Sequence, residues 1–258
     1  MFFLIFLLGL AVGSFINMAV YRYSQRWRIK DILAGAKFSS CDFCGRRLSW
    51  RENIPVASCW AQGGKSRCCR KKLPVTYPVV ELATGALFLI YSLRFITYGS
   101  NIVFFLLGLA MIALLVFSAV VDAKYLILPD EVTAMLIIIA VLGVVFDEKN
   151  IVPYLGSALG AAGFLGVIYL LSGGRGMGLG DVKLAVFMGL FLGWPQILLA
   201  VYTAFVAGAI VGLGLMMAGK AGRKTQIPFG PFLILGTIAA WFWGNGIWYY
   251  VLNSIYWR

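Results

Sequence analysis

Histidine is absent from this chain of 258 residues, and acidic residues are few, with 10 Asp and Glu against 22 Lys and Arg. Without an imidazole the chain cannot form a Ser-His-Asp triad, a Cys-His pair, a His-Glu-x-x-His zinc protease site or a His-ligated haem site. An enzyme that works by acid–base chemistry would therefore have to use one of the ten carboxylates.

Charged residues make up only 12% of the chain, whereas hydrophobic residues make up 61%. This composition lies outside that of soluble globular domains and indicates a membrane protein. A helix needs about 20 apolar residues to cross a hydrocarbon core of about 30 Å. The sequence therefore predicts an all-α polytopic membrane protein with eight spans, at residues 2–21, 78–97, 102–121, 131–146, 151–171, 182–194, 196–218 and 230–252. The first lacks the basic residues that begin a secretory signal, so we interpret it as a retained anchor.

The net charge of +12 is compatible with nucleic-acid binding, but the positions of the basic residues favour another explanation. Residues 22–72 form the only long polar segment and hold 13 of the 22 basic residues. With the N-terminus outside, 19 of the 22 fall in inner loops, and only Arg94, Lys149 and Arg258 fall outside. This asymmetry follows the positive-inside rule. It predicts both termini outside, a cytoplasmic loop after the first span, and no nucleic-acid partner. The sixth segment, 182–194, is the weakest span because it is short and contains glycine.

Two of the ten carboxylates, Asp122 and Asp181, stand at the ends of apolar segments. Asp122 closes the run 114–121, and Asp181 follows Gly178-Leu179-Gly180. In the topology above both lie at the inner membrane face, where ionisable groups are costly and indicate function. Two carboxyl groups in a site of low dielectric share one proton, so that one can activate water while the other hydrogen-bonds a peptide carbonyl. The alternative for each is a structural Asp that hydrogen-bonds a serine or Lys183.

The other acidic residues have simpler explanations. We expect Asp31, Asp42 and Glu52 to be solvated or paired with Arg and Lys in the loop, and Asp147 and Glu148 to lie in an outer turn. We expect Asp130, Glu131 and Glu81 at helix N-termini, where negative charge is favourable. For Glu81 a functional role stays open.

Seven short motifs occur in order along nearly the whole chain. They are Gly13-Ser14-Phe15-Ile16-Asn17 with Tyr21-Arg22, Cys41-x-x-Cys44, Glu52-Asn53-Ile54-Pro55 with Ser58, Tyr77-Pro78-Val79-Val80-Glu81-Leu82, Asp122 with Leu128-Pro129-Asp130, Gly178-Leu179-Gly180-Asp181-Val182-Lys183-Leu184, and Ile227-Pro228-Phe229-Gly230-Pro231. Together they resemble the type IV prepilin peptidases, bacterial inner-membrane aspartyl proteases of the Gly-x-Gly-Asp class. The resemblance implies that Asp122 and Asp181 are catalytic. Residues expected to support the substrate or the active site are Gly178, Gly180, Lys183, Pro228, Gly230 and Glu81.

The resemblance also implies a reaction. Members of this family cleave the leader of prepilins, or of type II secretion pseudopilins, at the cytoplasmic membrane face. Many then methylate the new N-terminal residue with S-adenosylmethionine. The methyl transfer rests on the resemblance alone, because residues 22–77 contain no glycine-rich strand–turn–helix pattern. Two roles are open for the segment 228–231: it holds the substrate strand, or it simply starts a helix. Other interpretations of the whole chain are a transporter or ion pathway that uses the Asp residues as a proton relay, and a non-catalytic pilus assembly subunit.

All five cysteines lie between Cys41 and Cys69. Family members with a large first loop carry two Cys-x-x-Cys pairs that bind zinc, but here Ser66 stands where the third cysteine is usual. Structural zinc prefers four ligands. We therefore expect Cys41, Cys44 and Cys69 to bind zinc with Cys68 as the fourth ligand, rather than Cys59. The alternative is a loop that has lost its metal; a disulfide is disfavoured in the reducing cytosol.

Three parts are predicted along the chain. Residues 1–21 form the first transmembrane helix, and residues 22–77 form a cytoplasmic Cys-rich loop associated with zinc and methyl transfer. Residues 78–258 form a seven-helix membrane domain that carries the protease site.

Overall fold

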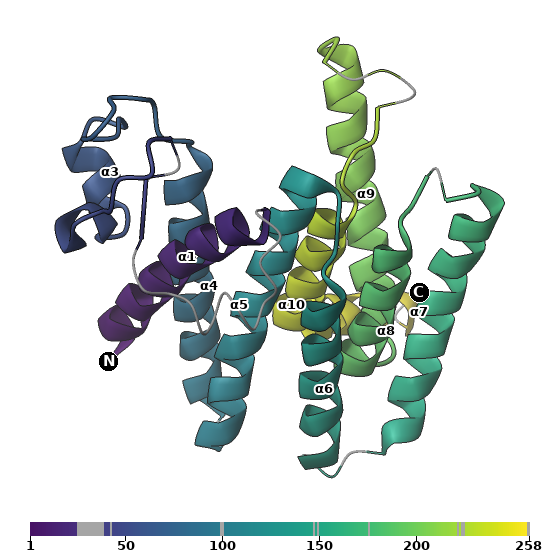
Figure 1. Ribbon diagram of the computed structural model, residues 1–258. Coiled ribbons are helices and arrows are strands. Elements are labelled where there is room, and N and C mark those ends of the chain that lie inside the picture. Colours follow the sequence, from purple (N-terminus) through teal and green to yellow (C-terminus); the bar gives the residue numbers. More distant parts are fainter. Residues whose placement is uncertain are drawn as a thin grey trace. The chain divides into compact units, whose positions relative to one another are not determined.

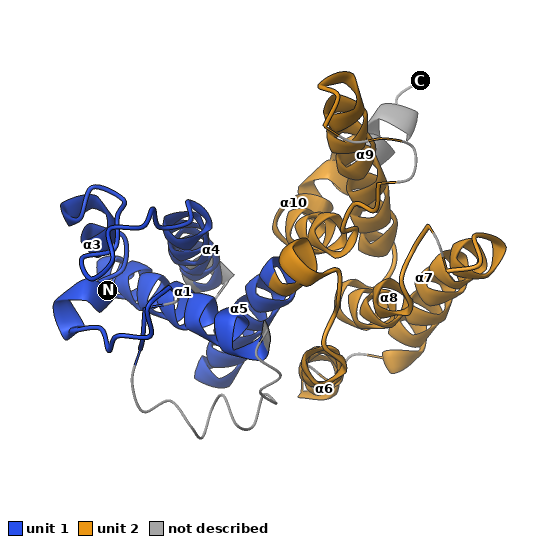
Figure 2. Ribbon diagram, turned by 45° about the horizontal axis from the view of Figure 1, so that its top comes forward, with its two compact units in different colours: residues 1–120 blue, residues 121–258 orange. Residues whose placement is uncertain are grey.

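The computed structural model describes residues 1–24, 39–41, 43–98, 101–146, 148, 150–174, 176–220, 222 and 225–256. Over these residues the chain is almost entirely helical, and its only β-structure is two isolated bridges (Figure 1). The chain divides into two compact units, residues 1–120 and 121–258 (Figure 2). Asp31, Asp42, Asp147, Lys149 and Arg258 lie outside the described residues.

Each of the eight predicted spans is a helix. The long helices are α1 (Phe2–Ser24), α4 (Thr76–Tyr98), α5 (Ile102–Tyr125), α6 (Asp130–Phe146), α7 (Ile151–Leu171), α8 (Leu179–Leu192), α9 (Gln196–Met217) and α10 (Gly230–Tyr256). Within the described residues, five segments are long and apolar enough to cross a bilayer; they lie in α1, α4, α5, α7 and α9. The protein is therefore a helical polytopic membrane protein. Helix α8 has 14 residues, which corresponds to about 21 Å at 1.5 Å per residue, so the number of eight crossings stays a prediction.

In unit 1, α1 and α4 pack closely through glycine. A Cβ atom on Gly9 would lie 2.7 Å from Cα of Gly85, and one on Gly13 would lie 2.6 Å from Cα of Glu81. Small residues at such crossings let two membrane helices approach each other. The amide of Asn17 on α1 also donates a hydrogen bond to the carbonyl of Tyr77 at 3.1 Å.

The polar loop of unit 1 contains little regular structure. It forms a 3-10 helix η1 (Trp50–Asn53) and a short helix α3 (Ala57–Ala61). Two turns carry the cysteines and are each closed by an isolated antiparallel bridge, Ser40 with Arg47 and Lys65 with Lys72. A loop of this size buries little apolar core, so it needs a metal or contacts with the helices to become ordered.

In unit 2, α8 is the central helix, with α6, α7 and α10 packed against it. Gly189 of α8 lies directly against the backbone of Ala158 on α7, and Gly236 of α10 lies against the backbone of Ala200 on α9. The side chains of Leu184, Phe187 and Met188 on α8 are fully buried among these helices. This tight packing sets the position of the first turn of α8, which carries Asp181.

We expect Gly189→Ala to destabilise the protein, because the added methyl group would meet the Ala158 backbone and force α7 and α8 apart. The loss in unfolding free energy should be about 1–3 kcal/mol, measured by thermal unfolding in detergent micelles. Gly160→Ala on α7 is the control, since its methyl group meets no atom within 4 Å and alanine is the better helix former. Equal unfolding temperatures for the two variants would contradict the close packing.

Candidate active site

Asp122 lies in the last turn of α5 and is buried, with 5% of its surface exposed. The negative end of a helix dipole is an unfavourable place for a carboxylate. The structure supplies compensation from another helix: the backbone N–H of Gly230, the first residue of α10, donates a hydrogen bond to Oδ2 of Asp122 at 3.0 Å. The positive end of the α10 dipole thus faces the carboxylate.

Asp181 lies in the first turn of α8 and is equally buried, with 6% exposed. Its Oδ2 accepts a hydrogen bond from the backbone N–H of Gly178 at 3.0 Å. This is the half of a capping box in which the third helical residue reaches back to the N-cap. A carboxylate is favourable at this position because it faces the free N–H groups of the helix. Both aspartates are therefore held by the backbone N–H of a glycine at a helix N-terminus.

Both aspartates line one cavity of about 900 Å³, which we call the Asp cavity. Its wall comes from three stretches of unit 2: the end of α5 with the residues after it, the segment before α8 with the first turn of α8, and the segment before α10. The lining residues are Asp122, Leu126, Leu128, Gly174, Gly176, Met177, Gly178, Gly180, Asp181, Thr225, Gln226, Ile227, Pro228 and Phe229. The two carboxylates predicted to act together thus share one site.

All three of the predicted supporting glycines lie at this site. Gly178 and Gly180 line the Asp cavity, and a Cβ atom on Gly180 would lie 2.9 Å from Cβ of Leu128. A Cβ atom on Gly230 would lie 2.7 Å from Oδ2 of Asp122. Any other residue at these two positions would push into the wall of the cavity or into the carboxylate.

Residues 225–229 are not helical, and α10 begins at Gly230. Pro228 lines the Asp cavity. Proline cannot donate a backbone hydrogen bond, so Pro228 and Pro231 favour a non-helical approach and a sharp helix start. The segment therefore begins a helix and also forms part of the cavity wall.

Lys183 is not among the residues that line the Asp cavity. Its Nζ lies 2.7 Å from Oδ1 of Asp130, and both side chains are largely exposed. The alternative in which Lys183 hydrogen-bonds Asp181 is not what the structure shows, because Lys183 instead pairs with Asp130 at the start of α6. The sequence carried no signal for this pairing.

Glu81 belongs to unit 1 and is buried in α4, with 8% exposed. Its Oε2 accepts a hydrogen bond from the backbone N–H of Val56 at 2.8 Å, and the side chain of Ser14 on α1 also hydrogen-bonds it. Val56 has a positive φ of 59°, which is unusual for a β-branched residue. Three motifs of the sequence, those around Ser14, Pro55 and Glu81, therefore meet at one carboxylate that fixes the polar loop to α1 and α4.

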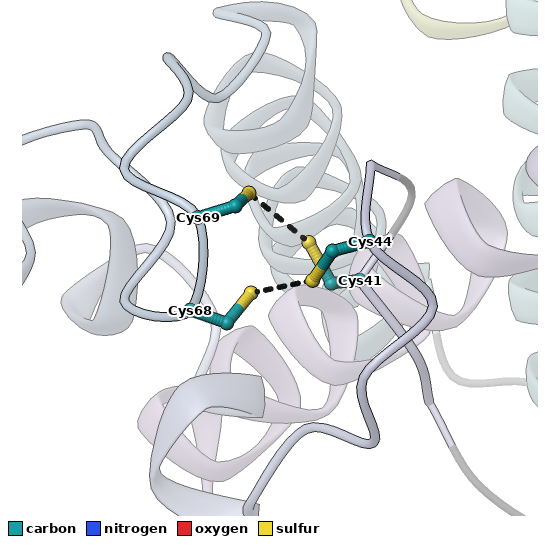
Figure 3. A group of neighbouring side chains, drawn as sticks. All are labelled: Cys41, Cys44, Cys68 and Cys69. Atoms are coloured by element: carbon teal, nitrogen blue, oxygen red, sulfur yellow. Dashed lines mark hydrogen bonds between the residues drawn. The ribbon is translucent and has the colours of Figure 1, made fainter.

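The sulphur atoms of Cys41, Cys44, Cys68 and Cys69 all lie within 4.8 Å of one another (Figure 3). The Sγ atoms of Cys41 and Cys69 are 3.9 Å apart, and those of Cys44 and Cys68 are 3.1 Å apart. In tetrahedral zinc sites, Zn–S bonds of about 2.3 Å place sulphur atoms about 3.8 Å apart. This group, the cysteine cluster, could therefore bind a metal ion, and Cys68 occupies the place expected for the fourth ligand.

Ser66 lies inside the cysteine cluster, although it is not a good zinc ligand. Its Oγ is 2.9 Å from Sγ of Cys68 and 3.4 Å from Sγ of Cys41. Burial raises the pKa of the Cys41 thiol, but hydrogen bonds from Ser66 and from the backbone at Phe43 and Cys44 outweigh it and lower the pKa to about 6. The Cys41 thiol therefore becomes the thiolate needed to bind a metal more readily than an ordinary cysteine does.

The fold and the paired buried aspartates, with a glycine-rich segment before the second, are those of a membrane-embedded aspartyl peptidase. Residues 7–95 match the bacterial peptidase A24 N-terminal domain, and residues 109–213 match the type IV leader peptidase family. The chain belongs to the type IV leader peptidase family.

Curated relatives support this family membership over most of the chain. The prepilin leader peptidase/N-methyltransferase of Bacillus subtilis (strain 168) is 32% identical and matches 95% of this chain and 95% of its own length. The protein of the same name from Stutzerimonas stutzeri is 31% identical and matches 93% of this chain and 90% of its own length. The protein of the same name from Burkholderia pseudomallei (strain 1026b) is 34% identical and matches 92% of this chain and 84% of its own length. No solved structure matches the chain.

We expect Glu81→Ala to loosen the polar loop, because the variant removes the acceptor of the Val56 N–H and of Ser14. Loss of this buried bond should raise the rate of trypsin cleavage after Arg51 roughly tenfold, measured by mass spectrometry of the native protein. Glu81→Gln keeps an acceptor oxygen and should cleave at close to the wild-type rate. Equal cleavage of the alanine variant and the wild type would show that Glu81 does not hold the loop.

Proposed function

We propose that this protein is a membrane aspartyl endopeptidase of the bacterial inner membrane. It removes the leader peptide of type IV prepilins or of type II secretion pseudopilins and then methylates the new N-terminal residue. The observation that carries the proposal is the pair Asp122 and Asp181, both buried and both lining the Asp cavity, in a chain of the type IV leader peptidase family. The membership in this family does not favour a transporter or ion pathway.

In the proposed reaction the two carboxyl groups share one proton, because two negative charges so close to each other in a low-dielectric site repel. The ionised carboxyl takes a proton from water as the water oxygen attacks the peptide carbonyl. The protonated carboxyl donates a hydrogen bond to the carbonyl oxygen. Breakage of the C–N bond then needs a proton on the leaving amine, which one of the two carboxyls supplies.

The backbone bonds to the aspartates have a role in this mechanism. Each carboxylate gives Oδ2 to a backbone N–H, from Gly230 and from Gly178. These bonds orient the carboxyl groups and leave Oδ1 of each to water or to the peptide. Preorganised groups of this kind lower the barrier because they need no reorientation during the reaction.

Residues 225–229 are the proposed support of the substrate strand. They are not helical and form one wall of the Asp cavity. A non-helical backbone at membrane depth is tolerated where it is buried in protein or lines a water-accessible cavity, and it offers N–H and C=O groups to an extended peptide. Gly178 and Gly180 on the facing wall let the peptide backbone approach Asp181 closely.

The proposed topology has eight crossings, with both termini outside and the polar loop and Asp cavity at the cytoplasmic face. The charge distribution supports this orientation. Helix α8 is too short for the full hydrocarbon thickness. Its N-terminus would lie below the membrane surface, where a water-accessible cavity could reach Asp181.

For the polar loop we propose structural zinc bound by Cys41, Cys44, Cys68 and Cys69. Four thiolates at this spacing fit tetrahedral zinc. The metal would order a loop that has little core of its own. The proposed methyl donor is S-adenosylmethionine, whose sulfonium methyl group would pass to the new terminal amine and leave S-adenosylhomocysteine and a proton.

Asp122→Asn and Asp181→Asn should each abolish leader removal. Asn has the size of Asp and keeps a side-chain oxygen that accepts the backbone N–H, but it cannot take up or give up the proton. Loss of a general acid or base lowers the rate by at least about 10²-fold. The mass of a co-expressed prepilin N-terminus measures cleavage and methylation together. Glu131→Gln, an exposed acid on α6, is the control and should cleave normally. Full cleavage by either Asp variant would refute the proposed mechanism.

Purified protein should contain about one zinc ion per chain by elemental analysis, and less than about 0.3 would count against a structural site. Cys68→Ala should lose the metal and lower the unfolding temperature. Cys59→Ala, the matched control, should keep it, since Cys59 is not part of the cysteine cluster. The opposite pattern would show that the ligand set is wrong.

A further inference from the structure

The first cysteine-bearing turn of the polar loop is closed by backbone contacts around Cys41. The N–H of Cys41 donates to the carbonyl of Arg46 at 2.8 Å, and the N–H of Gly45 donates to the carbonyl of Cys41 at 2.9 Å. On either side of these bonds, Ser40 and Arg47 form an antiparallel bridge. Gly45 adopts a left-handed φ of 70°, which glycine allows without strain. Together these contacts fix the shape of the turn.

The second turn makes the same contacts around Ser66. The N–H of Ser66 donates to the carbonyl of Lys71 at 2.9 Å, and the N–H of Arg70 donates to the carbonyl of Ser66 at 2.8 Å. Lys65 and Lys72 form the matching bridge, and Arg70 has a left-handed φ of 57°. Each contact of the first turn is therefore repeated 25 residues further along the chain, with Ser66 in the place of Cys41.

The repeat shows which thiol of the second turn is displaced. Cys69 is the counterpart of Cys44, whereas Cys68 stands where the first turn has Phe43. The sulphur of Cys68 nevertheless lies with the other three in the cysteine cluster (Figure 3). The second turn thus has a hydroxyl at the position of its first thiol, and it supplies the fourth sulphur from two residues further on.

Ser66 is placed to hydrogen-bond the sulphur atoms. Its side chain is buried, with 5% exposed, and its Oγ lies 2.9 Å from Sγ of Cys68 and 3.4 Å from Sγ of Cys41. The first turn supplies backbone donors to Cys41, at Phe43 and Cys44. Four thiolates around one divalent ion leave an excess of negative charge, so donors to the sulphur atoms stabilise a metal site. A thiolate has no proton, so the serine O–H must be the donor in the metal-bound site.

We propose that Ser66 is a positioning residue of the metal site, whose hydroxyl donates to the thiolate of Cys68 and holds it as the fourth ligand. This inference rests on the zinc site of the proposed function. The hydroxyl is not itself a ligand, because the usual zinc ligands are thiolate, imidazole and carboxylate groups. The donor at the ligand position thus compensates for the displaced thiol, which is two residues out of the repeat.

The test uses the purified full-length protein with zinc in competition with a chelator, and with cobalt as a spectroscopic probe. Ser66→Ala keeps all four thiols but removes the donor, so the zinc affinity should fall about tenfold to hundredfold. The cobalt spectrum should remain that of four thiolates. Its sulphur-to-cobalt charge-transfer band should move to lower energy, because a sulphur without its hydrogen bond gives up charge more readily. Ser40→Ala, at an exposed serine next to Cys41, is the control and should keep wild-type affinity.

A second pair of variants tests the repeat of the two turns. Ser66→Cys places a thiol at the position equivalent to Cys41. Zinc should therefore still bind to the double variant Ser66→Cys, Cys68→Ala, whereas Cys68→Ala alone should lose it. Loss of zinc from the double variant with an unchanged unfolding temperature would overturn the equivalence of the two turns.

Other results would overturn the role of Ser66. Wild-type zinc affinity and an unmoved cobalt band in Ser66→Ala would show that the hydroxyl does not support the thiolate, while the zinc site itself would stand. An equal loss of affinity in Ser40→Ala would show a general effect on the loop. Metal lost from Ser66→Ala but retained by Cys68→Ala would make the serine oxygen the ligand. A wild type that binds neither zinc nor cobalt would overturn the zinc site and this inference together.

Discussion

The structure depends on the burial of two carboxylates within a bundle of membrane helices. A buried charge without compensation is costly, and here the compensation comes from backbone N–H groups at the N-termini of two helices. Gly230 at the start of α10 serves Asp122, and Gly178 before α8 serves Asp181. Asp122 stands at the unfavourable end of its own helix, so the position of α10 is what makes that site tolerable. The hydrogen bonds to these two carboxylates thus come from the backbone, and each uses Oδ2.

The close helix contacts of unit 2 serve the same requirement. Helix α8 packs against α7 at Gly189, and α10 packs against α9 at Gly236, where a methyl group would meet a neighbouring backbone. These contacts fix where the two helix N-termini lie. Since a shift of about 1 Å can cost a catalytic site much of its rate, tight packing some distance from the aspartates matters to them. The ion pair between Lys183 and Asp130 connects α8 to α6 at the exposed end of the same bundle.

The polar loop has too little apolar surface to fold by burial alone, so other contacts must order it. Glu81 holds one part of it against α1 and α4, and the cysteine cluster holds another.

The sequence by itself determined the positions of the eight helices, the two aspartates and the cysteine set, since apolar length, charge asymmetry and residue chemistry are local properties of the chain. It also indicated Cys68 as the fourth member of the cluster, because only a short adjustment of the loop is needed. Only the tertiary structure decided which groups these side chains pair with. Lys183 pairs with Asp130 rather than Asp181, Glu81 accepts from Val56, and the N–H of Gly230 faces Asp122. These are contacts between segments far apart in sequence, and they follow from how the helices pack, which no local pattern of residues specifies.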